Sequence, residues 1–294
     1  MRRPPDSKRA IMRIGNNPMR GKPLQHTMPG EVATVTTHLP NQEGYHAQRL
    51  EVVQTCLKSM RNGAPGIPVM VWDNGSCQEL RDWLLDDYRP DFLVLSDNVG
   101  KHNAQKSIAN LFPPDTIIGF SDDDMLFWRG WWSESIRLLK GFPNVGMVSA
   151  WYARTATKWG IGSTLEWAGG EALVECGNFT PIEHEIDYAR SVGLQVDPHI
   201  TRISSLCDYK ITYKGMTCYA SAQHCQFITR AGVIGKYFRW SDQAMLGQKE
   251  LDERVDAGGY LRLTTFTRLA LHMGNVIDDE LRERIGDAFG TVMV

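Results

Sequence analysis

An apolar run that ends in three consecutive carboxylates constrains the fold of this chain more than any other feature. Residues 116–120 form the run, a pair of prolines precedes it, and Asp122, Asp123 and Asp124 follow it. Such a run, bounded in this way, predicts a central strand of a parallel sheet. Ligands of open α/β sheets bind beyond the carboxyl ends of the strands. The sequence therefore predicts a site where this strand ends.

The spacing of the three carboxylates predicts to which side of the strand each of them points. Successive strand residues face opposite sides, so Asp122 and Asp124 should project together and Asp123 away from them. Neighbouring carboxylates repel and raise each other's pKa, whereas a hard divalent cation with waters and phosphate ligands would neutralise them. A solvated acidic turn is the alternative that this pattern alone leaves open.

The segments around this strand alternate between strand and helix patterns. Segments 32–37, 67–72, 92–95 and 145–149 are β-prone, and helical periodicity or capping signals follow most of them. This alternation predicts an α/β fold, a three-layer α/β/α sandwich with a mainly parallel central sheet. A length of 294 residues fits one large domain. We expect that domain at residues 30–294, with a substrate-specific insertion at about 151–219, where the pattern weakens.

The first 29 residues predict an extended arm, because their prolines do not allow a sustained helix. Residues 1–22 contain seven basic residues and one acidic residue, a net charge of +6, although the whole chain has a net charge of −2. An acidic partner is therefore expected for the arm.

The cysteines and the hydropathy predict a reduced, cytoplasmic setting. The six cysteines show no CxxC spacing, and the N-terminus lacks the apolar core of a signal peptide. No apolar run approaches the length of a membrane span, so no integral membrane contact is expected.

Four features occur in a fixed order along residues 31–275. They are Asp73-Asn74-Gly75-Ser76 after the second strand, Asn98-Val99-Gly100 after the third, the acidic cluster in the form of a DXD motif after the fourth, and a late His272. In this order they resemble the nucleotide-sugar glycosyltransferases of the Rossmann-like GT-A fold, and most closely the family 2 inverting enzymes.

The resemblance implies metal-dependent transfer of a sugar, with inversion, from a nucleotide sugar to an acceptor hydroxyl. A UDP-sugar is the favoured donor, and Mn²⁺ or Mg²⁺ the expected cofactor. The metal ligands would be Asp122, Asp124 and His272, although a histidine satisfied within the core is an alternative for His272. The implied contacts to the donor nucleotide are Thr36, Thr37, Asp73, Asn98, Gly100, Lys101, Asp122 and Asp123.

The resemblance also implies a general base, which removes the proton of the acceptor hydroxyl. In the family this base starts a helix after the insertion, as the second residue of a Glu-Asp pair. Asp242 matches that position, but Ser241 replaces the Glu, so Asp252 is kept as the alternative. Asp242 could instead only favour the helix dipole. Three aromatic residues are candidates for stacking on the sugar or the acceptor: Trp128, Trp151 and Trp240.

The acceptor is the least determined part of this interpretation. Glycosyltransferases of this fold modify hydroxymethylated bases in phage DNA, and a basic arm would suit DNA as the acceptor. An enzyme acting on a saccharide or a lipid-linked glycan is the first alternative. A nucleotidyltransferase is another, but residues 37–40 lack its Gly-rich loop. A non-catalytic nucleic-acid-binding protein of the same fold is the last.

Overall fold

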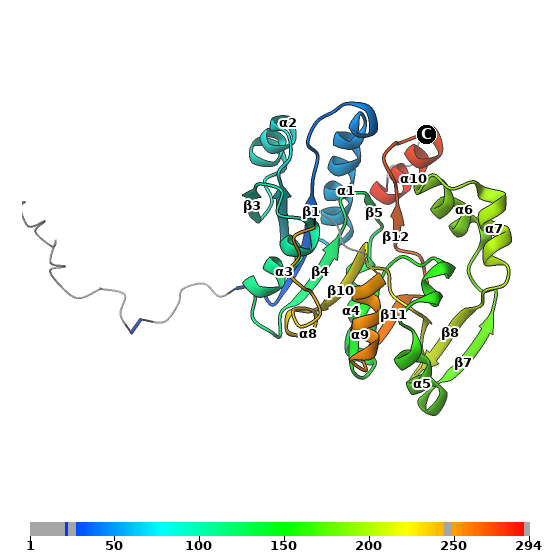
Figure 1. Ribbon diagram of the computed structural model, residues 1–294. Helices are drawn as coiled ribbons and strands as arrows, with labels where there is room; N and C mark the ends of the chain where they lie inside the picture. The colour runs from blue at the N-terminus through cyan, green and yellow to red at the C-terminus, as the bar shows by residue number, and fades with distance from the viewer. Residues whose placement is uncertain (1–20, 23–27, 244–248, 291–294) are drawn as a thin grey trace, which may run out of the picture.

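The computed structural model describes residues 21–22, 28–243 and 249–290 (Figure 1). Most of the predicted N-terminal arm lies outside the described residues, so its predicted conformation stays a prediction. Within the described parts of the chain, no helix has the length and apolar character needed to cross a membrane.

The first half of the chain forms the parallel part of a ten-stranded sheet within the described residues. Its strands lie in the order β3-β2-β1-β4, and all three pairings are parallel. These strands are β1 (Glu31–Thr37), β2 (Val69–Asn74), β3 (Phe92–Ser96) and β4 (Ile117–Ser121). The predicted α/β class with a parallel core is therefore confirmed.

The second half of the sheet is mixed rather than parallel. Next to β4 the order continues β10-β6-β11-β9-β8-β7, and β10 runs antiparallel to both of its neighbours. These strands are β6 (Val145–Ser149), β7 (Leu173–Gly177), β8 (Asp208–Tyr213), β9 (Met216–Ala220), β10 (Gln226–Arg230) and β11 (Leu261–Thr265). The segment predicted as an insertion thus contributes three antiparallel strands that extend the main sheet (Figure 1).

Helices cover both faces of the sheet. The α-helices of the described residues are α1 (Arg49–Gly63), α2 (Gln78–Asp82), α3 (Lys101–Leu111), α4 (Trp131–Gly141), α5 (Gly162–Glu171), α6 (Ile182–Ser191), α7 (Val196–Ile203), α8 (Ala231–Ile234), α9 (Lys249–Ala257) and α10 (Asp279–Phe289). Apolar residues of α1, α2, α4 and α10 belong to one hydrophobic core, and those of α3, α8 and α9 to a second.

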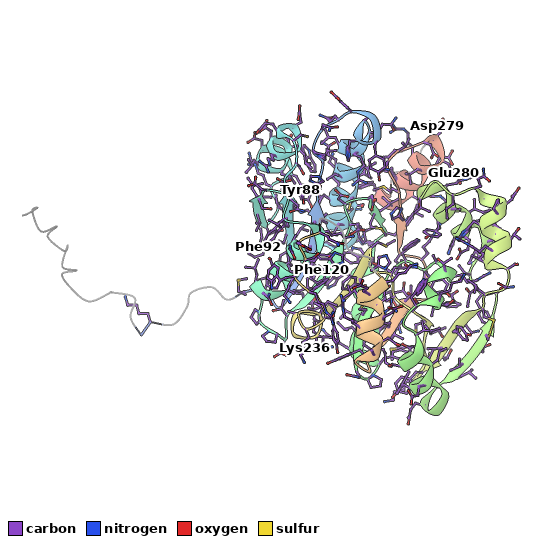
Figure 2. The ribbon with its side chains drawn as sticks, viewed as in Figure 1. Tyr88, Phe92, Phe120, Lys236, Asp279 and Glu280 are labelled. Atoms are coloured by element: carbon purple, nitrogen blue, oxygen red, sulfur yellow. A yellow bond between two sulfur atoms is a disulfide. The ribbon has the colours of Figure 1, made fainter. Side chains whose placement is uncertain are left out.

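Alternation along the strands explains the two cores. On β1, Val32 faces the second core and Ala33 the first; on β4, Ile118 and Phe120 face the second core. The ring of Phe120 packs 5.3 Å from that of Phe227 and lies inside the molecule (Figure 2). The three-layer sandwich expected from the sequence is therefore present.

A separate two-stranded sheet joins distant parts of the chain. It consists of β5 (Met125–Phe127) and β12 (Ala270–His272), which pair antiparallel with Met125 opposite His272. Because Asp124 directly precedes β5, this pairing brings His272 to the acidic cluster.

The cysteines differ in part from the sequence-based expectation of reduced thiols. Cys176, at the end of β7, and Cys207, just before β8, form a disulfide with a Cα–Cα distance of 5.6 Å. The antiparallel pairing of β7 with β8 places these two residues side by side, which the spacing in the sequence does not reveal. The other four cysteines are free thiols.

Candidate active site

A cavity of about 620 Å³ lies at the carboxyl ends of β4 and β6. Asp122 and Asp124 line it after β4, and Trp151 lines it after β6. Since β10 runs antiparallel to β4, with Gln226 opposite Ser121, the residues that precede β10 reach the same edge of the sheet. Helix α9, the end of α6 and the segment after β12 also contribute to the lining, so one cavity collects residues that lie far apart in the sequence.

The acidic cluster divides as strand alternation predicts. Asp122 and Asp124 line the cavity, whereas Asp123 turns toward β1 and accepts a hydrogen bond from Thr37 Oγ1 at 2.7 Å. The guanidinium of Arg49, at the start of α1, pairs with Asp123 and also with Asp124, at 3.2 Å. Both oxygens of Asp123 are thus engaged by the protein, and its predicted contact with the donor nucleotide would have to displace one of these partners.

Two cations neutralise the carboxylates that face the cavity. Lys101 pairs with Asp122, and Arg49 with Asp124. Burial raises the pKa of Asp122, and the ammonium of Lys101 offsets only part of this rise. Burial alone would also raise the pKa of Asp124, but the charges of His272, Arg49 and Lys101 outweigh it and lower that pKa. The two carboxylates therefore differ in their affinity for a proton, although they are close in sequence.

The cluster has ligands of the type that a divalent cation needs. His272 Nε2 lies 3.5 Å from Asp124 Oδ2, and both side chains line the cavity. Asp124 Oδ1 and His272 Nδ1 are buried and have no hydrogen-bond partner among the described residues. Across the described ranges, no three His, Cys, Asp or Glu side chains are already arranged around one point as a metal site. Mg²⁺-type sites, however, commonly use only one or two protein carboxylates together with substrate phosphates and water. The residues present therefore fit such an ion.

The loop after β2 is held by internal bonds. Asp73 is fully buried; its carboxylate accepts from Ser76 N at 3.1 Å and pairs with Arg81 Nε at 2.7 Å. These contacts indicate that the carboxylate of Asp73 holds the loop in shape. The order of motifs in the sequence, from which Asp73 was predicted to bind the nucleotide, does not show such contacts.

The loop after β3 lies against the loop after β2 and leads to the acidic cluster. Asn98 Oδ1 accepts from Asn74 Nδ2 and from Gly100 N, both at 3.0 Å. Lys101 then begins α3 and reaches Asp122. Thr36, at the end of β1, is half-buried and lies opposite Trp72 of β2 in the parallel pairing. The predicted nucleotide residues thus gather along one edge of the sheet, beside the cavity.

The three aromatic residues predicted to stack on a ligand do not converge. Trp151 lines the cavity, with its ring centroid 6.0 Å from that of His272. Trp128 lines a different hollow of about 820 Å³, and Trp240, 62% exposed, belongs to a third. Trp128 lies away from the acidic cluster, because β5 separates it from Asp124 by the length of the small sheet. Of the three, only Trp151 is placed beside the acidic cluster.

The two candidates for the base occupy different places. Asp242 lines the shallow hollow beside Trp240 and is not among the residues that line the cavity. Residues 241–243 are not helical, because the amide of Asn103 holds both the N–H and the carbonyl of Ser241. Asp252, in α9, lines the cavity with Asp122 and Asp124. The helix start that the resemblance implies at Asp242 is not found at residues 241–243, and residues 244–248 lie outside the described ones.

No protein-family model matches the chain, and no curated protein matches it. Solved structures do match. GalNAc-T7 with UDP, GalNAc and Mn²⁺ aligns at 12% identity with a TM-score of 0.49, covering 82% of this chain and 42% of that chain. Glucosyl-3-phosphoglycerate synthase from Mycobacterium tuberculosis, in complex with Mn²⁺, UDP and glucosyl-3-phosphoglycerate, aligns at 10% identity with a TM-score of 0.43, covering 89% and 77%. The mannosyltransferase PcManGT from Pyrobaculum calidifontis, in complex with GDP-Man and Mn²⁺, aligns at 19% identity with a TM-score of 0.33, covering 44% and 37%.

This likeness concerns the fold alone. The bifunctional IspDF from Campylobacter jejuni also matches, at 8% identity with a TM-score of 0.39, covering 79% of this chain and 48% of that chain. The chain spans less than half the length of three of these four structures. Since every TM-score is below 0.5, the chemistry of the site has to be inferred from its own residues.

Sequence reasoning missed three charged or polar residues of the site: Arg49, His224 and Arg262. Arg49 is the first residue of α1, and the periodicity of that segment indicates only which residues face the core. It does not indicate that Arg49 pairs with Asp123 and Asp124. His224 Nδ1 lies 2.9 Å from Asp252 Oδ2, a pairing of residues from different elements. Arg262 is fully buried on β11 and pairs with Asp252 at 2.7 Å. Their separation in the chain leaves no local motif that could have revealed them.

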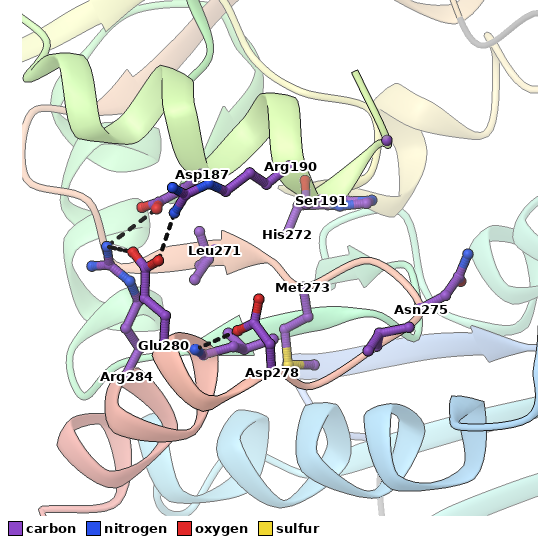
Figure 3. Close-up of a pocket in the computed structure, with 13 residues that line it drawn as sticks. Asp187, Arg190, Ser191, Leu271, His272, Met273, Asn275, Asp278, Glu280 and Arg284 are labelled. Atoms are coloured by element: carbon purple, nitrogen blue, oxygen red, sulfur yellow. Dashed lines mark hydrogen bonds and ion pairs between the residues drawn. The ribbon is translucent and has the colours of Figure 1, made fainter. Parts of the chain in front are cut away.

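A smaller hollow of about 300 Å³ adjoins the cavity (Figure 3). The two share Ser191, Gly193, His272 and Asn275. The side chain of Asn275 accepts a hydrogen bond from Arg49 Nη1 at 3.0 Å, which connects the hollow to the acidic cluster. A ligand of the cavity could therefore extend past His272 into this hollow.

Proposed function

We propose that this protein is a metal-dependent glycosyltransferase that moves a sugar, with inversion, from a nucleotide sugar to an acceptor hydroxyl. The observation that carries the proposal is the cavity where Asp122, Asp124 and His272 meet Asp252. The acidic cluster with His272, and the separate pair of Asp252 with His224, line the same cavity and match the two needs of the reaction. The leaving diphosphate requires positive charge, and the attacking hydroxyl requires a proton acceptor.

The donor side of the site would be the edge formed by the loops after β1 to β4. Asp124 and His272, with Asp122 beside them, would hold Mn²⁺ or Mg²⁺. When bound, such an ion stabilises the negative charge that develops on the leaving phosphate. Lys101 and Arg49, which neutralise the carboxylates, could also turn toward the diphosphate. A UDP-sugar is the favoured donor.

The acceptor side would be the wall formed by α9, the residues before β10 and the segment after β6. Asp252 belongs to this wall, together with Trp151 and Trp159. Lys249 lies over the ring of Trp159, 4.0 Å from its centroid. Aromatic faces with a nearby cation suit a sugar ring or a base, and they would orient the hydroxyl toward the donor.

The loop after β1 counts against a nucleotidyltransferase, the runner-up enzyme class. Both backbone groups of Leu39 are bonded to the segment after β2: its N–H donates to Ser76 Oγ at 3.0 Å, and its carbonyl accepts from Cys77 N at 2.7 Å. A Gly-rich phosphate loop instead presents free backbone N–H groups to the ligand.

For the acceptor we propose a hydroxymethylated base of DNA. The support for it is the net charge of +6 on residues 1–22, which suits a polyanion. A saccharide or lipid-linked glycan is the alternative acceptor. With that acceptor, the basic residues of the arm would not be needed to bind the substrate.

A panel of nucleotide sugars tests the enzyme class. Each is added to the full chain with and without Mn²⁺, and the unfolding temperature and the release of nucleoside diphosphate are measured. A donor should stabilise the protein only with Mn²⁺, by about 2.7 kcal/mol at a hundredfold excess over Kd. If no nucleotide sugar is bound or cleaved, the proposal is wrong. DNA binding in that case would favour the non-catalytic alternative.

A further inference from the structure

His224 and Asp252 form a hydrogen-bonded pair in the wall of the cavity that Asp122 and Asp124 also line. The Nδ1 atom of His224 lies 2.9 Å from Oδ2 of Asp252, and both residues line the cavity. The two members of the pair differ in exposure: the side chain of His224 is 28% exposed, and that of Asp252 is 5% exposed. The imidazole therefore offers the more accessible surface to a ligand.

The carboxylate of Asp252 also contacts a second residue, Arg262. Arg262 Nη2 forms an ion pair with its other oxygen, Oδ1, at 2.7 Å. Arg262 is itself fully buried, and its Nη1 donates to the carbonyls of Trp159 and Gly160, both at 2.7 Å. Oδ2 contacts His224, and Oδ1 is buried beside Arg262, so the carboxylate is fixed in place and poorly placed to receive an acceptor hydroxyl itself.

This arrangement fixes the tautomer of the imidazole. A carboxylate only accepts hydrogen bonds, so the nitrogen that faces it, Nδ1, carries the proton. Nε2 then holds a lone pair, and it has no hydrogen-bond partner among the described residues. A histidine oriented by a buried carboxylate in this way is suited to accept a proton from a reacting hydroxyl.

We propose that His224 is the general base of the transfer and that Asp252 is a positioning residue that acts through it. The inference rests on the proposed function and deepens it. As the acceptor oxygen bonds to the anomeric carbon, its proton passes to His224 Nε2. The bond from that carbon to the phosphate oxygen breaks, and its electron pair leaves with the nucleoside diphosphate. The proton then passes from Nε2 to solvent.

The test uses the full chain and the nucleotide sugar that the panel selects, with water in place of the acceptor. His224→Ala and the nearly isosteric His224→Gln should lower kcat by about 10² to 10⁴, the usual contribution of a general base. KM for the nucleotide sugar and Mn²⁺-dependent binding of UDP or GDP should stay unchanged. Added imidazole should restore turnover to His224→Ala. The matched control is His184→Ala, since His184 lines a different hollow and should keep the wild-type rate.

A double variant separates the roles of the pair. If Asp252 acts only through His224, then His224→Ala combined with Asp252→Asn should be no slower than His224→Ala alone. A double variant that is much slower, or a His224→Ala variant that keeps the wild-type rate, overturns the inference while the proposed function stands. A wild-type protein that neither binds nor cleaves any nucleotide sugar refutes the proposed function and this inference with it.

Discussion

His272 Nε2 lies 3.5 Å from Asp124 Oδ2, although the two residues come from opposite halves of the chain. The contact follows from the small sheet, in which His272 pairs with Met125, the residue after Asp124. A backbone pairing thus sets the separation of two side chains that could share one ion. Loss of either side chain should therefore weaken binding of an ion at the proposed metal site.

Asp124→Ala should abolish the Mn²⁺-dependent binding of UDP or GDP, because it removes the carboxylate that lies nearest to His272. Binding is measured as the shift in unfolding temperature with nucleotide and Mn²⁺ together. Asp115→Ala, an exposed carboxylate before β4, is the matched control and should bind as the wild type does. Undiminished turnover of Asp124→Ala in the presence of a chelator would contradict a metal site here.

Asp252→Asn should retain donor binding and lower turnover by about 10² to 10⁴. The negative charge of Asp252 stabilises His224 when the imidazole accepts the proton of the acceptor. The neutral amide of Asn does not supply that charge. Asp242→Asn should keep the wild-type rate, because Asp242 lines a different hollow. Rates and nucleotide binding are measured for both variants. The reverse result, with turnover lost only in Asp242→Asn, would return the base to Asp242.

The basic arm should increase the salt dependence of DNA binding. Binding to duplex DNA is measured against salt for the full chain and for a chain that begins at Gly30. The full chain should show the steeper fall of log K with log salt, by about 0.9 for each phosphate that the arm neutralises. Equal and weak binding by both chains, with no transfer to hydroxymethylated DNA, would exclude this acceptor.

His102 should make the protein less stable in acid. It is 3% exposed in α3, and burial, with the charges of Lys101 and Arg254, lowers its pKa to about 4. The unfolded chain takes up this proton near pH 6.5 and the folded chain only near pH 4, so stability falls as the pH drops through that window. The loss from this one group reaches about 3 kcal/mol at pH 4.

His102→Gln should therefore lose less stability than the wild type between pH 6.5 and pH 4. Urea unfolding at several pH values measures the difference. His184, whose pKa burial also lowers to about 4, is present in both proteins, so its contribution cancels. Parallel curves for the two proteins over this window would show that His102 is not responsible.

Much of the fold followed from local patterns. Alternation along the strand placed Asp122 and Asp124 on one side, and the succession of strands and helices indicated the layered sheet. The direction of β10 did not follow, because this strand is buried on both faces and so lacks the alternation that is typical of antiparallel strands. The segment 151–219 gave weak signals, since its strands lie toward the edge of the sheet and carry exposed residues such as Leu173.

The sequence by itself determined the identity of the acidic cluster and its place at the end of a buried strand, because both depend on neighbouring residues. Only the tertiary structure decided which distant side chains meet there. Arg49 reaches the cluster through the docking of α1, and His272 through the pairing of β12 with β5. The pair of His224 with Asp252 requires β10 to run antiparallel and α9 to pack beside it. Contacts of this kind depend on strand order and helix packing over long separations in the chain, which no local pattern encodes.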